Sequence, residues 1–148
     1  MLVKLITDQK NWTEKFTQFG SPSFLQSWSW GKFQEKQGHP FLALAVQNNQ
    51  QQTIALALVI KHNAKRGRFL FVPHGPIFSP QLTKDKQKKA LETLKNYLVK
   101  IAAKEKFGFI RIAPIIEENE ENRQLFTSLG FHQAPIYLHS ERCWLIDN

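Results

Sequence analysis

The sequence predicts a mixed α/β fold in which a mostly antiparallel sheet is flanked by helices. Three strand-like segments follow one another across short turns, at residues 41–46, 54–60 and 68–72, and strands joined in this way form an antiparallel meander. A long amphipathic segment begins after Thr83, and a further apolar strand follows it at residues 107–112. A meander followed by a helix, a strand and a second helix gives a mixed sheet with helices on both faces.

The amino-terminal part predicts one strand and two helices. Residues 2–6 alternate loosely and predict an edge strand. A helix is expected over residues 8–19, because large apolar residues recur there at helical spacing and a glycine follows. Ser27 caps a second, shorter helix that carries Trp30 and Phe33 on one side.

The remaining elements complete the predicted sheet and its second layer of helices. Residues 41–46 are apolar throughout, which is typical of a strand buried on both faces. A short amphipathic helix is expected over residues 119–129, with a glycine as its carboxyl-terminal stop. Phe131 and residues 136–137 and 143–146 are predicted as strand material. With no internal repeat and no long linker, residues 1–148 are expected to form a single domain.

The composition excludes several classes of protein. The chain has 148 residues, 42% of them hydrophobic and 22% charged, which is ordinary for one globular domain. No apolar run approaches the roughly 18 residues of a membrane-spanning helix, and the amino terminus does not resemble a signal peptide. Cys143 is the only cysteine, and the histidines lack metal-ligand spacing, so we expect no disulfide framework, no metal site and a cytoplasmic location.

The net charge of +8 points to an anionic partner, such as nucleic acid, a nucleotide-linked substrate or an acidic membrane surface. The basic residues gather around one turn and along one helix; they are Lys61, Lys65, Arg66 and Arg68 at the turn, and Lys84, Lys86, Lys88, Lys89, Lys95, Lys100, Lys104 and Lys106 on the helix and its end. The simpler interpretation of the helix set is a solvated face. The acidic residues concentrate within residues 117–121, so the surface is predicted to be polarised.

An unusual turn follows the third strand of the meander. It contains His74 and Gly75 between Pro73 and Pro76. The prolines fix φ and lack an amide proton, whereas glycine adopts conformations that other residues avoid. Ligands of sheets with parallel strands tend to bind at the strands' carboxyl ends. The turn is therefore either a purely structural feature or part of a binding site.

The predicted order of elements resembles the GNAT acyltransferase fold. Residues 122–131 also look like the GNAT segment in which an asparagine opens a helix that ends in Leu-Gly-Phe. GNAT proteins that use acetyl-CoA carry a glycine-rich loop before the long helix, where backbone amides bind the pyrophosphate. The corresponding residues 76–83 contain no glycine and two prolines. Acetyl-CoA is therefore not expected as the acyl donor, and no cofactor is predicted.

Several segments in a fixed order carry a closer resemblance. They are residues 24–33 (FLQSWSWGKF), 54–58 (IALAL), 73–76 (PHGP), 110–114 (IRIAP) and 142–147 (RCWLID). Together they resemble the Fem family, the aminoacyltransferases that build the interpeptide bridges of peptidoglycan. The resemblance extends over nearly the whole chain. The presence of all five segments in this order is much more specific for the family than any one segment.

The resemblance implies a function in cell-wall biosynthesis. Fem proteins resemble two GNAT-like domains in tandem, and they move an amino acid from aminoacyl-tRNA to the stem-peptide amine of a lipid- or nucleotide-linked peptidoglycan precursor. This chain corresponds to the first domain, which holds much of the precursor-binding surface. One alternative is a non-catalytic precursor-binding half, or a degenerate relative, that needs a partner chain or pairs with itself as a homodimer. A basic nucleic-acid-binding domain is a third hypothesis, motivated by charge alone.

Two positions depart from the family pattern. His74 stands where the family commonly has arginine or lysine before Gly-Pro, and a neutral imidazole binds anions more weakly. Ala113 stands where the family often has a carboxylate, so that role is not carried over to it. No catalytic residue or general base is assigned.

The second helix carries four candidate substrate-binding residues. Family members use a lysine there to meet the precursor diphosphate, and Lys32 and Lys36 lie one helical turn apart; the alternative is that both are solvated. If the segment is helical, Trp28 and Trp30 are not expected to face the core together. Trp30 is then predicted to join Phe33 in the core, while Trp28 is partly exposed and available to stack on a ligand ring.

The other candidate substrate-binding residues are His74, Gly75 and Arg111. Arg111 alternates with isoleucines on a predicted strand, where a charge is costly unless it is paired or faces a ligand. It is expected either to pair with a glutamate of residues 117–121 or to face the precursor. His74 is a possible proton carrier for which the sequence identifies no partner.

Overall fold

A computed structural model describes residues 1–65 and 67–135 of the chain. The chain divides into two compact units, Met1–Glu117 and Glu118–Asn148. The first unit contains a six-stranded sheet in the order β1-β2-β3-β4-β6, with β5 paired to β3. Its strands are β1 (Leu2–Ile6), β2 (Phe41–Gln47), β3 (Thr53–Ala64), β4 (Gly67–Pro73), β5 (Ile77–Phe78) and β6 (Phe109–Ala113). Its helices are α1 (Gln9–Gln18), the short 3-10 helix η1 (Phe24–Gln26), α2 (Trp28–Lys36) and α3 (Lys84–Glu105).

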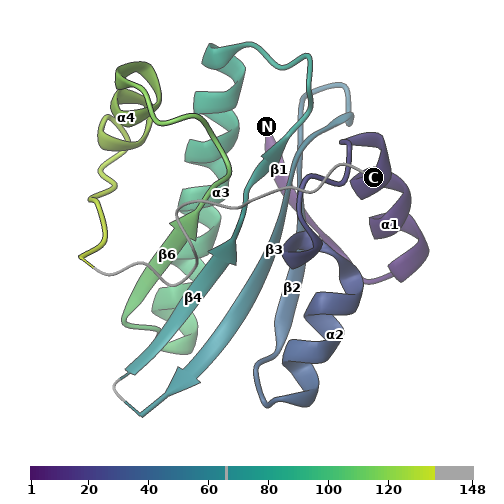
Figure 1. Cartoon of the computed structure of the whole chain (residues 1–148), viewed down its shortest axis with the longest axis vertical. Helices are drawn as coiled ribbons and strands as arrows, with labels where there is room; N and C mark the ends of the chain where they lie inside the picture. The colour runs from purple at the N-terminus through teal and green to yellow at the C-terminus, as the bar shows by residue number, and fades with distance from the viewer. Residues whose placement is uncertain (66, 136–148) are drawn as a thin grey trace, which may run out of the picture. The chain divides into compact units, whose positions relative to one another are not determined.

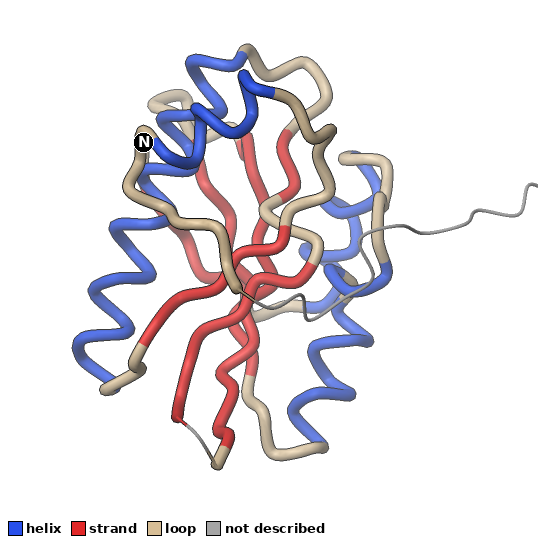
Figure 2. Tube along the Cα trace, turned by 60° about the vertical axis from the view of Figure 1, so that its left-hand side comes forward, coloured by secondary structure: helices blue, strands red, loops and turns tan. Residues whose placement is uncertain are grey.

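The sheet of the first unit is covered by helices on both faces, as predicted. Figures 1 and 2 show α3 on one side of the sheet and α1 and α2 on the other. Alternate residues of β2 divide between the two layers of the core: Leu44 and Val46 pack on the α3 side, whereas Ala43 and Ala45 pack on the side of α1. The fully apolar segment is thus buried on both faces because each face has its own hydrophobic layer.

The predicted meander is confirmed, and β6 extends it in parallel. β2 pairs antiparallel with β3, and β3 pairs antiparallel with β4. β4 and β6 are parallel, with Phe71 opposite Arg111 and Pro73 opposite Ala113. The carboxyl ends of β4 and β6 therefore lie at the same edge of the sheet, which is where ligands of such sheets tend to bind.

The helix ends follow from local hydrogen bonds. Asp8 Oδ2 accepts a hydrogen bond from Asn11 N (2.7 Å) at the start of α1, and Ser27 Oγ accepts one from Trp30 N (3.2 Å) at the start of α2. Both are N-cap bonds that satisfy amides at the helix start. Thr83 stands at the N-cap of α3 but makes no side-chain capping bond.

Two basic residues near the β3–β4 turn, Lys61 and Arg68, bind the end of α3. Lys61 Nζ lies 2.8 Å from Glu105 Oε2. Arg68 Nη1 donates to Glu105 O (2.8 Å), and the Arg68 guanidinium lies 4.4 Å from the centre of the Phe107 ring. These two charged side chains therefore connect the sheet to the end of α3. Arg66 lies outside the described residues.

The second unit contains helix α4 (Glu120–Thr127) within its described part. Asn119 Oδ1 accepts a hydrogen bond from Asn122 N (2.9 Å) and caps this helix, which lies within the predicted range. Phe131 is not in a strand, contrary to expectation; its amide donates to Phe126 O across the turn that ends the helix. The strands predicted at residues 136–137 and 143–146 lie outside the described residues. No helix in the described part of the chain is long and apolar enough to cross a membrane.

Candidate substrate-binding site

The turn after β4 has an unusual backbone. His74 has a φ of +48°, a left-handed conformation that few residues other than glycine adopt, with histidine among the more frequent exceptions. At Gly75 a Cβ atom would lie 2.8 Å from Cδ and Nε2 of Gln26. Glycine is therefore needed there because another side chain already occupies the space.

Gln26 is fully buried and replaces a missing strand partner in the sheet. β3 pairs with β5 at Ala55 and Leu56 and with β4 from Ile60 onward. Between these pairings, Leu58 N donates to Gln26 Oε1 (2.7 Å) and Gln26 Nε2 donates to Leu58 O (3.3 Å). A side-chain amide has the same donor and acceptor as a peptide group, so Gln26 completes the hydrogen bonding of the β3 backbone.

The same glutamine ties η1 to the turn after β4 and to α1. Its Nε2 also donates to Pro73 O, and Trp12 Nε1 donates to Gln26 O (3.0 Å). Buried polar groups are costly unless they are hydrogen-bonded, and these contacts satisfy Gln26. The sequence prediction did not single out Gln26, although this residue lies within the Fem-like segment of residues 24–33.

Ser23 makes a second connection between η1 and the turn. Its Oγ accepts a hydrogen bond from Leu25 N (3.3 Å), which caps η1, and lies 2.8 Å from Nδ1 of His74. This supplies the partner for His74 that the sequence did not identify. The two residues are 51 positions apart in the chain, so no local pattern indicates the contact.

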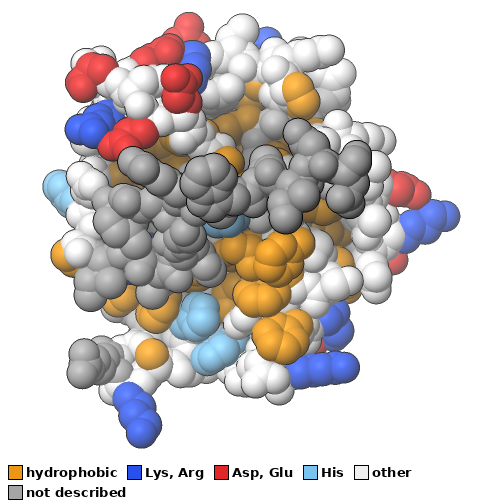
Figure 3. All heavy atoms as spheres, in the orientation of Figure 1, with side chains coloured by type: hydrophobic (Ala, Val, Ile, Leu, Met, Phe, Trp, Pro, Cys, Tyr) orange, Lys and Arg blue, Asp and Glu red, His pale blue; other side chains and the backbone are white. Residues whose placement is uncertain are grey.

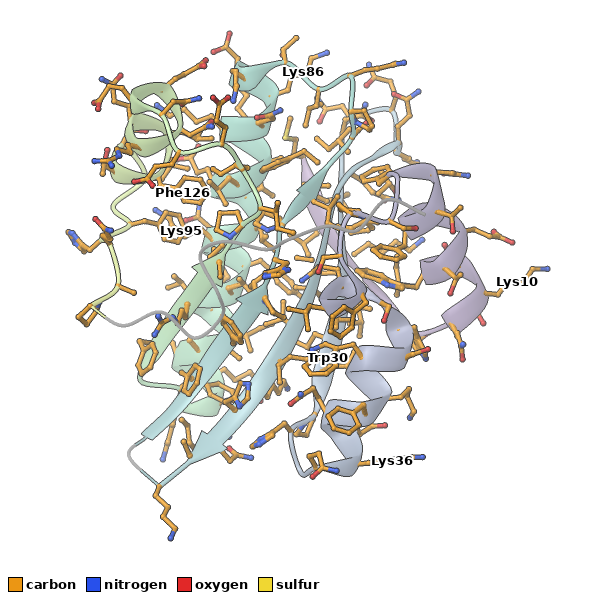
Figure 4. The ribbon with its side chains drawn as sticks, in the orientation of Figure 1. Lys10, Trp30, Lys36, Lys86, Lys95 and Phe126 are labelled. Carbon is orange, nitrogen blue, oxygen red and sulfur yellow. The ribbon has the colours of Figure 1, made fainter. Side chains whose placement is uncertain are left out.

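An aromatic surface that we call the aromatic shelf consists of Phe24, Trp30 and Phe33. Phe24 meets Trp30 edge to face with ring centres 5.5 Å apart, and Trp30 stacks on Phe33 at 5.3 Å. Phe24 is 68% exposed and Phe33 is 49% exposed. Figure 3 shows hydrophobic side chains gathered on this face of the molecule, and Figure 4 labels Trp30 on α2.

The predicted division of the two tryptophans holds for Trp28, which is partly exposed as expected, but not for Trp30 and Phe33. Both Trp28 and Trp30 are half-buried and pack against the core layer on the side of α1, whereas Phe33 is exposed rather than in the core. The reason is that α2 contacts the sheet through Gly31, where a Cβ atom would lie 2.7 Å from the Phe41 ring. The helix approaches the sheet at this glycine, so the tryptophans flank the contact and both reach the core.

A shallow hollow of about 260 Å³ brings together three predicted site residues. It is lined by Gln9, Trp28, Ser29, Lys32, Phe33 and Lys36. Lys32 forms an ion pair with Glu35, and both side chains are about half exposed, so this pair leaves the lysine accessible to solvent. Figure 4 shows Lys36 at the end of α2, on the edge of the molecule in that view. The hollow therefore combines the ring of Trp28 with the ammonium groups of Lys32 and Lys36. These groups suit a ligand in which an anionic group is attached to a ring.

Arg111 belongs to neither the hollow nor the aromatic shelf. It lies on β6 opposite Phe71, is half-buried, and has no hydrogen-bond or ion-pair partner within the described part of the chain. Its strand runs to the same sheet edge as β4, at whose end His74 and Gly75 lie. The structure thus places the predicted site residues in three groups. The first lies on α2 and consists of Trp28, Trp30, Lys32 and Lys36. The second is His74 with Gly75, which contact η1, and the third is Arg111 on β6.

The segment between β4 and α3 has a different structure from a phosphate-binding loop. Ile77 and Phe78 form β5 and pair with β3, an element the sequence analysis missed because two residues between prolines give no periodic pattern. Ser79 N donates to Ile54 O and Leu82 N donates to Ser79 O, both at 3.0 Å. These amides are thus already used within the protein. The described residues also contain no group of three or more His, Cys, Asp or Glu side chains placed to hold a metal ion.

The fold is that of the GNAT acyltransferases. It is similar to an aminoglycoside 6'-N-acetyltransferase from Acinetobacter haemolyticus, with 16% identity and a TM-score of 0.62 over 97% of this chain and 99% of that one. It is also similar to glucosamine-6-phosphate N-acetyltransferase from Arabidopsis thaliana, with 12% identity and a TM-score of 0.57 over 95% of this chain and 98% of the other. The predicted GNAT-like fold is therefore confirmed.

The chain belongs to the FemAB family, whose model matches residues 7–147. The crystal structure of FemX is similar as well, with 21% identity and a TM-score of 0.70 over 88% of this chain. The match spans 32% of the FemX chain. No curated protein matches the sequence. The resemblance to the Fem family inferred from the sequence segments is thus confirmed.

Proposed function

We propose that this chain is an aminoacyltransferase-type domain that binds a peptidoglycan precursor and serves the transfer of an amino acid from aminoacyl-tRNA to its stem peptide. The observation that carries the proposal is the match of the FemAB family over residues 7–147. The net charge of +8 supports it, because the diphosphate-linked precursor and tRNA are both anions. A location in the cytoplasm follows from the use of aminoacyl-tRNA.

We assign precursor binding to the hollow on α2 and to the edge of the sheet. Lys32 and Lys36 bind the diphosphate as point charges, and Trp28 lies beside them to stack on a ring of the ligand. His74 and Arg111 contact the precursor at the carboxyl ends of β4 and β6. Trp30 and Gly75 support these contacts, the first through the aromatic shelf and the second through its packing on Gln26.

In the proposed reaction the stem-peptide amine attacks the carbonyl carbon of the aminoacyl ester. A C–N bond forms and the ester C–O bond breaks. The ribose oxygen of the tRNA leaves and takes up the proton that the amine loses. Proximity of the two substrates and stabilisation of the developing charge supply most of the rate in such a reaction. No side chain is assigned as general base.

A second candidate function is precursor binding without catalysis, in which the transfer needs a partner chain or a second copy. The observation that favours it is the span of the match, which covers 32% of the FemX chain. The two candidates differ in one observable. A binding domain alone takes up the precursor but does not transfer an amino acid to it from aminoacyl-tRNA unless the partner is added.

Calorimetric titration with a nucleotide-linked muropeptide tests the assigned site. We expect the double substitution Lys32→Ala plus Lys36→Ala to weaken precursor binding by about tenfold or more, since hydrogen bonds from charged groups contribute about 1.5 to 3 kcal/mol. The matched control is Lys86→Ala plus Lys89→Ala, which removes the same charge from the exposed side of α3. If the wild type and the α2 variant bind the precursor with equal affinity, the assigned site is contradicted. If the α2 variant and the α3 control lose equal affinity, the effect is one of net charge and not of a site on α2.

A further inference from the structure

The aromatic shelf presents ring systems from two consecutive elements to solvent. Phe24 belongs to η1, and Trp30 and Phe33 lie three residues apart on α2. The rings contact one another, with centres 5.5 Å and 5.3 Å apart, and yet Phe24 is 68% exposed and Phe33 is 49% exposed. Figure 3 shows hydrophobic side chains gathered on this face. A contiguous exposed apolar patch of this kind marks an interaction surface.

The shelf is fixed in place by the buried residues beneath it. Trp30 is half-buried and packs against the core layer on the side of α1. The short helix η1, which carries Phe24, is held to β3 by the hydrogen bonds between Gln26 and the Leu58 backbone. Immobilising a side chain costs free energy on binding, and that cost is small for rings that are already packed. The shelf is therefore ready to bind a partner without rearrangement.

Lysines border the shelf on α2. Lys32 and Lys36 are exposed and line the hollow together with Phe33, which also belongs to the shelf. Lys32 pairs with Glu35, whereas Lys36 forms no ion pair within the described part of the chain. Figure 4 labels Trp30 and Lys36 on this one helix. Exposed rings beside lysines fit an anionic membrane surface, where the rings enter the boundary of the acyl chains and the ammonium groups stay among the headgroups.

An anionic membrane fits this surface better than a protein partner does. Lysine is depleted in protein–protein interfaces, whose cores exclude charged residues. Lysines beside large apolar side chains are instead typical of segments that lie on anionic lipid. The net charge of +8 adds a long-range attraction to such a bilayer. The shelf and its lysines thus supply both the apolar and the electrostatic part of binding to a membrane surface.

We propose that the aromatic shelf, together with Lys32 and Lys36, is a membrane-docking surface that binds a bilayer of anionic lipids. The hollow shares Phe33 with the shelf, so it lies beside the bilayer surface when the shelf is docked. A lipid-linked precursor carries its diphosphate at that surface, and the diphosphate is the group assigned to the two lysines. The docking surface therefore selects the lipid-linked form of the precursor, and this last step rests on the proposed function.

Co-sedimentation of the full chain with vesicles tests the docking surface without any precursor. We expect reversible binding to vesicles of equal parts phosphatidylcholine and phosphatidylglycerol. Phe24→Ser plus Phe33→Ser is expected to weaken this binding about tenfold or more, because full burial of even one such ring contributes about that factor. Lys32→Ala plus Lys36→Ala is expected to weaken it by about tenfold, since each lysine near an anionic surface contributes about fivefold. Vesicles of phosphatidylcholine alone are expected to bind the wild type more weakly.

The matched control is Leu2→Ser plus Val99→Ser, which removes two half-exposed apolar side chains from β1 and α3 and is expected to leave vesicle binding unchanged. Phe24→Trp plus Phe33→Trp keeps the rings and is expected to retain binding, because tryptophan is favoured at membrane–water interfaces. The docking surface is overturned if the wild type does not bind anionic vesicles, or if the serine variant binds them as the wild type does. Equal losses in the serine variant and its control also overturn it.

Vesicles that also carry the lipid-linked precursor test the choice of substrate. We expect the wild type to bind these vesicles more tightly than plain anionic vesicles. The serine variant is expected to lose affinity for the lipid-linked precursor but to keep most of its affinity for a nucleotide-linked muropeptide in solution. Equal losses for both forms overturn the selection of the lipid-linked form. If the precursor does not strengthen vesicle binding, the proposed function is contradicted, and the docking surface is still decided by the plain vesicles.

Discussion

Replacement of Gln26 by leucine tests the argument that a side chain completes the sheet. Leucine keeps much of the apolar volume but removes the hydrogen bonds of Gln26 to Leu58 and Pro73. Three backbone groups then stay buried without these partners: the N–H and C=O of Leu58 and the C=O of Pro73. An unpaired buried group costs about 1 to 3 kcal/mol, so the three together predict a loss of about 3 to 9 kcal/mol. This is a large fraction of the total of about 5 to 15 kcal/mol for a typical domain.

Urea denaturation of the purified chain measures this loss. We expect Gln26→Leu to lower the midpoint strongly with little change in the m-value, because the native and unfolded states expose similar surface to the wild type. Gln18→Leu is the matched control, since Gln18 is exposed on α1 and surface changes usually stay within about 0.5 kcal/mol. If Gln26→Leu lies within about 0.5 kcal/mol of this control, the proposed role of Gln26 in the sheet is refuted.

Two further predictions concern packing at the turn and the basic residues of the β3–β4 region. Gly75→Ala places a Cβ atom 2.8 Å from the Gln26 side chain and is expected to lower the free energy of unfolding by about 1 to 3 kcal/mol. This loss is expected to be smaller in a Gln26→Ala background. If the two substitutions are additive in the double-mutant cycle, the contact is contradicted. Gly108→Ala, where the nearest atom is 3.5 Å away, is the control. Lys61→Ala removes the partly exposed ion pair with Glu105 and is expected to cost about 0.5 to 1 kcal/mol at low salt; a loss that does not shrink as salt is raised contradicts an ionic origin.

Much of the fold could be predicted because it follows from local sequence patterns. The continuous apolar segment of β2 predicted burial on both faces, and the spacing of apolar residues predicted α3. A capping side chain marked the start of α2 at Ser27, and the spacing of large apolar residues marked α1. These features depend on residues a few positions apart, so the sequence alone carries them.

The candidate site depends instead on contacts between distant segments. The bonds of Gln26 to Leu58 and Pro73 join residues 32 and 47 positions apart, and no periodicity indicates them. The exposure of Phe33 was missed for a related reason, since the side of α2 that meets the sheet is set by the contact of Gly31 with Phe41. The resemblance to the Fem family located the correct segments, and the three-dimensional structure was needed to connect them.

The most direct test of the central claim is calorimetric titration of the full chain with peptidoglycan precursor, in nucleotide-linked and in lipid-linked form. The proposed function predicts saturable binding of at least one form that weakens in the α2 variant lacking both Lys32 and Lys36. It also predicts weaker binding of a nucleotide sugar without the stem peptide. A folded chain that binds neither form of the precursor contradicts the account.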